Sequence, residues 1–114
     1  MTKTMPKPKG TCGATKLKIM AVIYNNEQQG LKSYGYHIWQ CLREFFYTYM
    51  NEGDIRNVYH HLEDLCRLGY IAKCPNTSDH IKQCYRMTEQ GLSLEEKYRN
   101  YLMVLNQRGS RLLS

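Results

Sequence analysis

One stretch, residues 54–71, constrains the fold more than any other part of the chain. It reads DIRNVYHHLEDLCRLGYI. Its apolar residues recur at steps of three and four, which places them on one stripe of an α-helix. They are Ile55, Val58, Leu62 and Leu65. Asp54 suits the N-cap, because its carboxylate can accept from unpaired N–H groups of the first turn. Gly69 suits the left-handed residue that ends a helix, and Tyr70 then begins a strand. The stretch therefore predicts a helix over 54–68 that ends at a glycine and leads directly into a strand.

Size and composition fit one globular domain. The chain has 114 residues, of which 42% are hydrophobic and 23% are charged. These values are typical of a folded chain rather than a disordered one. The longest apolar run, residues 19–24, is too short to span a bilayer. The N-terminal lysines are not followed by the apolar region of a secretory signal. We therefore expect a cytoplasmic protein without a membrane partner.

The positive charge of the chain is concentrated at its two ends. The net charge is +6, yet residues 19–96 carry a net charge of −3. Residues 1–18 contain five lysines and no acid, and residues 97–114 contain four basic residues and no acid. Such ends attract a polyanion. Proline and glycine interrupt residues 1–13, so this segment is predicted to be a flexible basic arm, with Lys3–Lys18 supplying phosphate contacts.

Two helices are predicted between the arm and the opening stretch. The first should run from about Ala14 to about Asn26. The second should cover residues 34–46, with Ser33 as its N-cap. Gly35 in its first turn would permit close contact with a neighbouring helix. The backbone N–H groups at the start of this helix could bind a phosphate. The residues expected beside that phosphate are Lys32, Ser33 and Tyr34.

A hairpin and a last helix are predicted after Gly69. The strands, residues 70–74 and 80–87, flank a turn cluster rich in proline, asparagine, serine and aspartate. Thr88 is the predicted N-cap of a helix that lasts to about Asn106. Its apolar stripe exceeds what a small domain covers alone, which favours pairing of two such helices in a homodimer. The expected dimer interface consists of Leu94, Tyr98, Tyr101, Leu102 and Leu105.

The cysteines and histidines do not form a recognisable metal or catalytic motif. None of the five cysteines forms a CxxC pair, and the histidines lack zinc-finger spacing. Free buried thiols are therefore expected. Cys74 and Cys84 flank the predicted hairpin, but a register centred on the turn would not place them opposite each other. GxSxG, HExxH, P-loop and dinucleotide glycine motifs are absent from the sequence. We expect no enzyme, no metal and no cofactor.

Three motifs resemble those of the PadR-like transcription regulators, within the broader MarR-type winged-helix group. Residues 34–38 (YGYHI) resemble the signature of the family's second helix. Residues 57–71 resemble its recognition helix, although Asn57 replaces the usual threonine or serine. Residues 85–91 (YRMTEQG) resemble its second wing strand. The resemblance, in which the motifs come in the family's order, covers about residues 17–105.

The resemblance implies a fold that is mainly α with a small β-hairpin wing. The winged helix-turn-helix DNA-binding domain would cover residues 14–87, and a long C-terminal dimerisation helix with its tail would cover residues 88–114. The function that the family implies is sequence-specific binding of double-stranded DNA by a homodimeric transcription regulator. Two recognition helices would then read half-sites about 34–36 Å apart.

The candidate DNA-contacting residues lie opposite the apolar stripe of the first stretch. Arg56, Asn57 and His60 are the base-reading candidates, because the first turns of a recognition helix enter the major groove. Arginine pairs with guanine and asparagine with adenine. Tyr59 lies on the flank, where its hydroxyl could reach a phosphate. An ordinary solvated helix face is the alternative interpretation for each of these residues.

The second half of this helix and the hairpin complete the predicted DNA surface. Carboxylates at Glu63 and Asp64 repel phosphates, so contacts are expected in the first two turns. The wing, residues 70–87, would grip the backbone or the minor groove. Its candidate residues are Lys73, Asn76, Thr77, Ser78, His80 and Lys82. A winged-helix module for protein–protein interaction, without specific DNA binding, is the alternative function, and the acidic middle of the chain favours it. The sequence indicates no particular inducer.

Overall fold

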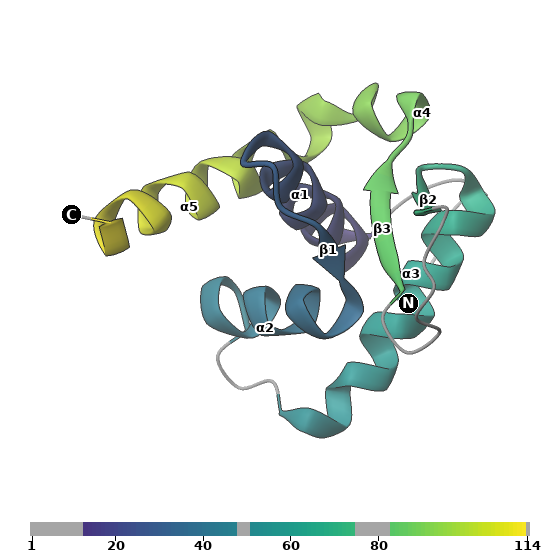
Figure 1. The fold of residues 1–114 in the computed structure, drawn as a ribbon, viewed down its shortest axis with the longest axis horizontal. Coiled ribbons are helices and arrows are strands. Elements are labelled where there is room, and N and C mark those ends of the chain that lie inside the picture. Colours follow the sequence, from purple (N-terminus) through teal and green to yellow (C-terminus); the bar gives the residue numbers. More distant parts are fainter. Residues whose placement is uncertain (1–12, 48–50, 75–82, 114) are drawn as a thin grey trace, which may run out of the picture.

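Within residues 13–47, 51–74 and 83–113, which the computed structural model describes, helices surround a small antiparallel sheet (Figure 1). The elements are α1 (Ala14–Gln28), β1 (Ser33–Tyr34), α2 (Gly35–Phe45), the 3₁₀ turn η1 (Glu52–Asp54), α3 (Ile55–Leu68), β2 (Ile71–Lys73), β3 (Cys84–Met87), α4 (Glu89–Leu92) and α5 (Glu95–Leu113). The predicted fold class, mainly α with a small β-hairpin, is confirmed. Among these helices, none combines the length and the apolar character that crossing a membrane requires.

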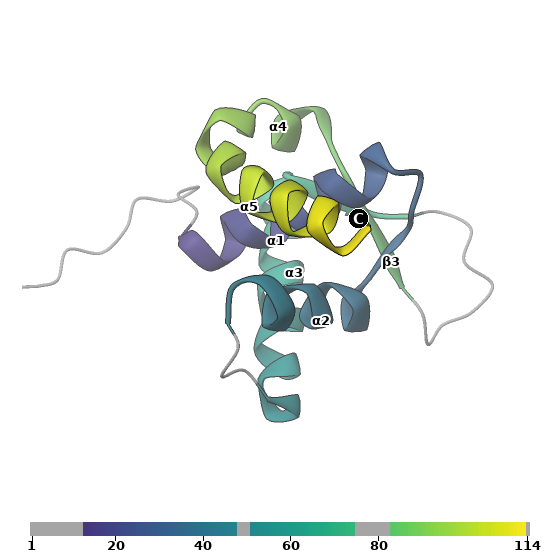
Figure 2. The same cartoon turned by 90° about the vertical axis from the view of Figure 1, so that its left-hand side faces the viewer.

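Helix α1 forms the centre of the core. Five consecutive residues of it, Ile19 to Ile23, are all buried. A helix that is apolar on every side has to be covered on every side. α2, α3, α5 and β3 all contact α1, and α5 crosses it in both views of the ribbon (Figures 1 and 2). The largest buried side chain, Trp39 of α2, belongs to the same core and donates from Nε1 to the carbonyl of Asn51 at 3.1 Å.

Helix α3 has the predicted inward stripe and the predicted end. Val58, Leu62 and Leu65 are buried, and Gly69 follows with a left-handed φ of 88°. Its start differs from the prediction in the role of the Asp54 side chain. Asp54 has a helical backbone, and its carboxylate turns back to accept from the backbone N–H of residue 51 at 2.9 Å. Asp54 is the N-cap residue of α3, as predicted, but its side chain makes no capping hydrogen bond to the first turn.

The sheet has the strand order β1–β3–β2, so β3 lies in the middle and both pairings are antiparallel. The hairpin of β2 and β3 was predicted, whereas β1 was not. Ser33 pairs with Tyr85 in β1 and is buried, and its hydroxyl accepts from Nδ2 of Asn26 at 3.0 Å. α2 begins only at Gly35. The prediction of Ser33 as the N-cap of the second helix is wrong, because the chain is extended there and pairs with β3.

Cys74 and Cys84 form a disulfide at the base of the hairpin. The two residues lie opposite each other, with Cα atoms 5.4 Å apart, and the N–H of Cys74 donates to the carbonyl of Cys84 at 2.9 Å. The prediction that they are not opposite is wrong. The ladder pairs Lys73 with Tyr85, so the segment that it closes, residues 75–83, is longer than the five-residue tip predicted from the turn cluster.

The third motif of the sequence joins the two ends of the hairpin. Thr88 accepts from the N–H of Gly91 at 3.1 Å, and its own hydroxyl donates to the carbonyl of Gly69 at 2.6 Å. A Cβ on Gly91 would lie 2.1 Å from the carbonyl oxygen of Tyr70, so only glycine fits. The predicted N-cap at Thr88 is confirmed, but it caps the short helix α4. The predicted single last helix is interrupted after α4, and α5 begins at Glu95.

The apolar stripe of α5 packs into the core of its own chain. Tyr98, Leu102 and Leu105 are buried, and the ring of Tyr98 lies edge-on to that of Tyr24 with centroids 6.0 Å apart. These three predicted dimer-interface residues pack within their own chain, because α5 lies across α1. The other two, Leu94 and Tyr101, are half-buried against the same core. Apolar surface on α5 remains at Met103, which is 52% exposed.

Candidate nucleic-acid interface

The first half of α3 projects from the rest of the molecule. In both ribbon views its N-terminal turns extend past α2 at the bottom of the molecule (Figures 1 and 2). The three base-reading candidates, Arg56, Asn57 and His60, are exposed there, on the side opposite the buried Val58 and Leu62. A projecting helix end with exposed guanidinium, amide and imidazole groups has the shape and the donors that major-groove recognition requires.

Tyr59 docks α3 onto the first turn of α2. A Cβ on Gly35 would lie 2.3 Å from Cε1 of Tyr59 and 2.9 Å from its hydroxyl. The predicted close contact at Gly35 is thus confirmed, and its partner is the Tyr59 ring. This ring is still 39% exposed. The contact fixes the relative position of α2 and α3, and it places the phenol beside the start of α2.

The three residues predicted at the start of α2 differ in accessibility. Lys32 is exposed and Tyr34 is half-buried. The N-cap residue is Tyr34, whose side chain makes no capping hydrogen bond to the first turn. The N–H groups of such a turn can donate to a bound anion. Ser33 is 1% exposed and bound to Asn26, so its hydroxyl cannot reach a phosphate. The predicted contact of its backbone N–H with DNA stays a prediction.

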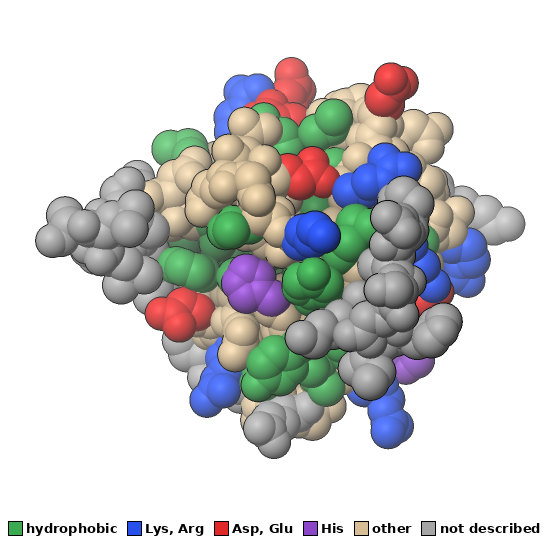
Figure 3. All heavy atoms as spheres, viewed as in Figure 1, with side chains coloured by type: hydrophobic (Ala, Val, Ile, Leu, Met, Phe, Trp, Pro, Cys, Tyr) green, Lys and Arg blue, Asp and Glu red, His purple; other side chains and the backbone are tan. Residues whose placement is uncertain are grey.

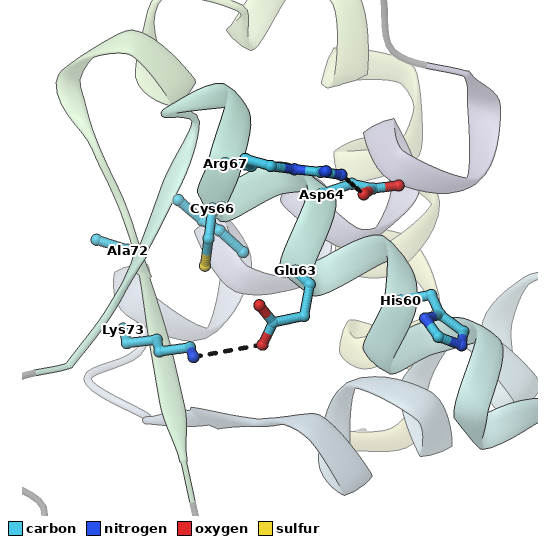
Figure 4. A pocket seen from close by; sticks show the side chains of 8 residues that line it. His60, Glu63, Asp64, Cys66, Arg67, Ala72 and Lys73 are labelled. Carbon is cyan, nitrogen blue, oxygen red and sulfur yellow. Dashed lines mark hydrogen bonds and ion pairs between the residues drawn. The ribbon is translucent and has the colours of Figure 1, made fainter.

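The charges of the second half of α3 are paired within the chain. Asp64 forms ion pairs with Lys16 of α1, at 3.5 Å, and with Arg67. Glu63 Oε2 lies 3.3 Å from Nζ of Lys73 in β2. These groups border an open groove of about 720 Å³ between α3 and β2 (Figure 4). The groove is lined by His60, Glu63, Asp64, Cys66, Arg67, Ile71, Ala72 and Lys73.

A second contact joins α1 to this half of α3. Nζ of Lys16 lies 3.0 Å from Nδ1 of His61. An ammonium group only donates, so Nδ1 accepts and the imidazole is neutral. Burial and the neighbouring Lys16 lower the pKa of His61. Although desolvation acts in the opposite direction, Lys16 and Arg67 lower the pKa of Asp64. The cluster is stable with a charged Asp64 and an uncharged His61.

Two lysines of the basic range Lys3–Lys18, Lys16 and Lys18, lie in α1. Lys16 binds His61 and Asp64, as described above. Nζ of Lys18 donates to the hydroxyl of Tyr47 at 2.9 Å and lies 4.2 Å from the centroid of the same ring. In the free protein Lys16 and Lys18 are thus engaged within the chain, and their predicted phosphate contacts stay a prediction. Residues 1–12 lie outside the described residues. On the face that Figure 3 shows, basic and acidic side chains of the described residues are interspersed.

Of the predicted wing contacts, the structure describes only one. Lys73 is the last residue of β2, is exposed and forms its ion pair with Glu63. The others, Asn76, Thr77, Ser78, His80 and Lys82, lie outside the described residues. The sequence missed both the Cys74–Cys84 disulfide and the pairing of Lys73 with Glu63. The register of β2 against β3 decides the disulfide, and the packing of α3 beside β2 decides the ion pair. Residue spacing alone contains neither.

The described part of the chain has no group of three or more potential metal ligands placed to hold an ion. Its free cysteines are Cys41 and Cys66, and both are half-buried. Burial, with a smaller contribution from a nearby glutamate, raises the pKa of Cys41 to about 11. Burial also raises the pKa of Cys66. Both thiols are therefore protonated at neutral pH, which makes them poor nucleophiles and poor metal ligands.

No family model and no curated protein matches the chain by sequence. Solved structures do match. RosR of H. salinarum, in crystals grown from NaBr, is 19% identical with a TM-score of 0.56 over 89% of this chain and 96% of RosR. The hsRosR-S4 complex gives 20% identity and 0.56 over 90% and 93%. A Thermoplasma acidophilum protein described as a transcriptional regulator gives 15% identity and 0.49 over 90% and 96%, and this weaker likeness supports no argument. The likeness to RosR shows the fold, a winged helix-turn-helix.

Proposed function

We propose that the protein is a sequence-specific transcription regulator that binds double-stranded DNA as a homodimer. The observation that carries the proposal is the projecting first half of α3, where Arg56, Asn57 and His60 are exposed together. Inserted into the major groove, the guanidinium would pair with a guanine and the amide with an adenine. The Tyr59–Gly35 contact supports this role, because it packs α3 against the first turn of α2.

Phosphate contacts would flank the inserted helix on both sides. On one side lie the first turn of α2, the ammonium of Lys32 and the hydroxyl of Tyr59. On the other side lies the wing, residues 70–87, with Lys73 at the end of β2 and further polar residues beyond the disulfide. Residues 1–13 would add contacts that do not depend on sequence. The Cys74–Cys84 bond supports the role of the wing, because it holds the base of the hairpin together.

We propose that the dimer forms through residues 88–114. Met103 would lie at the interface, because the tyrosine and leucines predicted first are buried within their own chain. Met103 is 52% exposed on α5, and Val104 beside it is half-buried. A two-fold axis there would present two copies of α3 to half-sites about 34–36 Å apart. Light scattering on the full chain and on Met103→Lys tests this. A monomeric parent protein would contradict it.

Within the winged-helix group, we propose the PadR-like branch and a cytoplasmic, non-enzymatic regulator. The fit of the third motif supports the branch. Thr88 of that motif donates from its hydroxyl to the carbonyl of Gly69 and from its N–H to the carbonyl of Tyr70, and both of these residues belong to the second motif. The two motifs therefore contact each other directly.

Selection of bound duplexes from a random DNA pool tests the proposed function. We expect one enriched sequence with two related half-sites. Arg56→Ala should relax the preference at one base pair of each half-site, by about 1–3 kcal/mol. The matched control is Arg99→Ala, because Arg99 is an exposed arginine that pairs with Glu95 on α5, a helix that packs mainly on α1. A pool without enrichment would contradict the proposal.

A protein–protein interaction module remains the second candidate, and the paired carboxylates on the second half of α3 favour it. In that case α3 would face a protein partner, and Glu63 and Asp64 would bind its basic groups. A gel shift on random duplex DNA separates the two functions. Retention of DNA that weakens steeply with added salt supports the regulator, and indifference to DNA supports the module.

A further inference from the structure

The ion pair between Glu63 and Lys73 spans the open groove between α3 and β2. Its two side chains approach from different elements, and Nζ lies 3.3 Å from Oε2 (Figure 4). Both side chains are well exposed, Lys73 at 49% and Glu63 at 61%. An exposed pair of this kind is weak and exchanges readily with other ions. The lysine is therefore held by a carboxylate that a stronger anion can replace.

Lys73 is a described cation of the wing, and its ammonium is paired with Glu63 in the free protein. A DNA phosphate that binds Lys73 has to displace Glu63 first. The carboxylate then remains beside the groove without its partner and repels the same phosphate. The other carboxylate, Asp64, differs from Glu63, because two cations hold it and one of them, Lys16, is only 18% exposed.

We propose that Glu63 is an internal competitor of DNA for Lys73 and thereby sets the affinity of the wing for phosphate. The inference rests on the proposed DNA-binding function and adds to it a residue that touches no base. Because a phosphate contact is independent of sequence, Glu63 weakens binding to selected and to random duplexes by the same factor. Selectivity stays with the first half of α3.

The test measures the Kd of the full chain for the selected duplex and for a random duplex at low salt. Glu63→Gln should tighten both about two- to five-fold, and the gain should shrink as salt is added. Lys73→Ala should weaken both and lower the salt slope by about one. The matched control is Glu95→Gln, which removes a carboxylate from an exposed pair on α5 and should leave both Kd values unchanged.

The double variant decides whether Glu63 acts through Lys73. With Lys73→Ala in place, Glu63→Gln should give little further gain, because the lysine that it released is gone. If Glu63→Gln tightens the Kd as much in this background as in the parent, the competition is overturned, and Glu63 acts only by repelling phosphates. A Glu63→Gln variant that binds like the parent would also overturn it, while the DNA-binding function stands. A parent that binds no duplex overturns both proposals. Since both side chains are exposed, thermal unfolding should show every variant folded.

Discussion

The two halves of α3 belong to one helix, but their polar side chains differ in whether they form ion pairs. In the first half Arg56, Asn57 and His60 project into solvent, with no ion pair among the described residues. In the second half Asp64 and Glu63 are paired with cations from α1, α3 and β2. The first half is thus available for a ligand, and the second half fastens the helix to the domain. A recognition helix needs both properties, because a loosely held helix cannot place its side chains accurately.

A substitution in the buried stripe of α3 should destabilise both halves of the helix, and this is the largest effect that we expect. Leu62 is fully buried in the middle of α3. Leu62→Ala should lower the free energy of unfolding by about 2–5 kcal/mol, because it removes apolar contacts and leaves a cavity. Urea unfolding measures the change. Leu31→Ala, at a leucine that is 51% exposed, is the control and should cost less than about 0.5 kcal/mol.

Adding a carboxylate to the first half of α3 and removing one from the second half should affect DNA binding and stability separately. Asn57→Asp adds a carboxylate to the first half with little change of shape. It should weaken binding of the selected duplex by about 1–3 kcal/mol through lost base contacts and added repulsion. Asp64→Asn removes a carboxylate from the second half. Its main effect should be on thermal stability, because Lys16 and Arg67 lose their shared partner. Equal effects of the two variants on DNA selectivity would contradict the division of α3.

The contact of Tyr59 with Gly35 allows the position of α3 to be disturbed without unfolding. Gly35→Ala would push the Tyr59 ring aside. The ring is partly exposed and can move, and alanine improves helix propensity, so the free energy of unfolding should change little. Binding of the selected duplex should weaken by about 1 kcal/mol. Tyr59→Ala removes the three atoms nearest to the new methyl group, so in that background Gly35→Ala should add no further loss of affinity.

Low pH should weaken the contact between α1 and the second half of α3 and so lower folding stability. This is the smallest effect that we expect. The pKa of His61 in the folded protein is below its ordinary value of 6.5, owing to burial and to Lys16. The unfolded chain therefore takes up a proton first as the pH falls below about 6.5, and folding stability decreases. Above that pH the contribution is fully present. Thermal unfolding at pH 7 and pH 5 should show a smaller decrease for His61→Gln than for the parent.

What could be predicted from the sequence was local. The stripe Val58, Leu62 and Leu65 and the glycine end of α3 follow from helical periodicity and from a backbone preference, and neither depends on distant segments. The exposure of Arg56 and Asn57 follows from the same periodicity. The placement of Thr88 as a cap was also local, since its partner is only three residues away.

What could not be predicted depends on contacts between distant segments. β1 consists of two residues held by backbone pairing, which leaves no side-chain pattern to detect. The pairing of Cys74 with Cys84 depends on the strand register. Tyr98 was expected at a dimer interface, because the stripe of α5 looks the same whether α1 or a second chain covers it. For the same reason Ser33, a typical capping residue, was placed on a helix although it lies in a strand.

The central position of α1 also determines when the protein can fold during its synthesis on the ribosome. Among the described residues α1 is the first element in sequence, while α5, which covers one of its sides, is the last. A nascent chain that has reached β3 still exposes the apolar residues on that side of α1 to water. Contacts over such long sequence separations form slowly, and exposed apolar surface invites aggregation. We therefore expect the domain to fold after α5 has left the exit tunnel, rather than helix by helix.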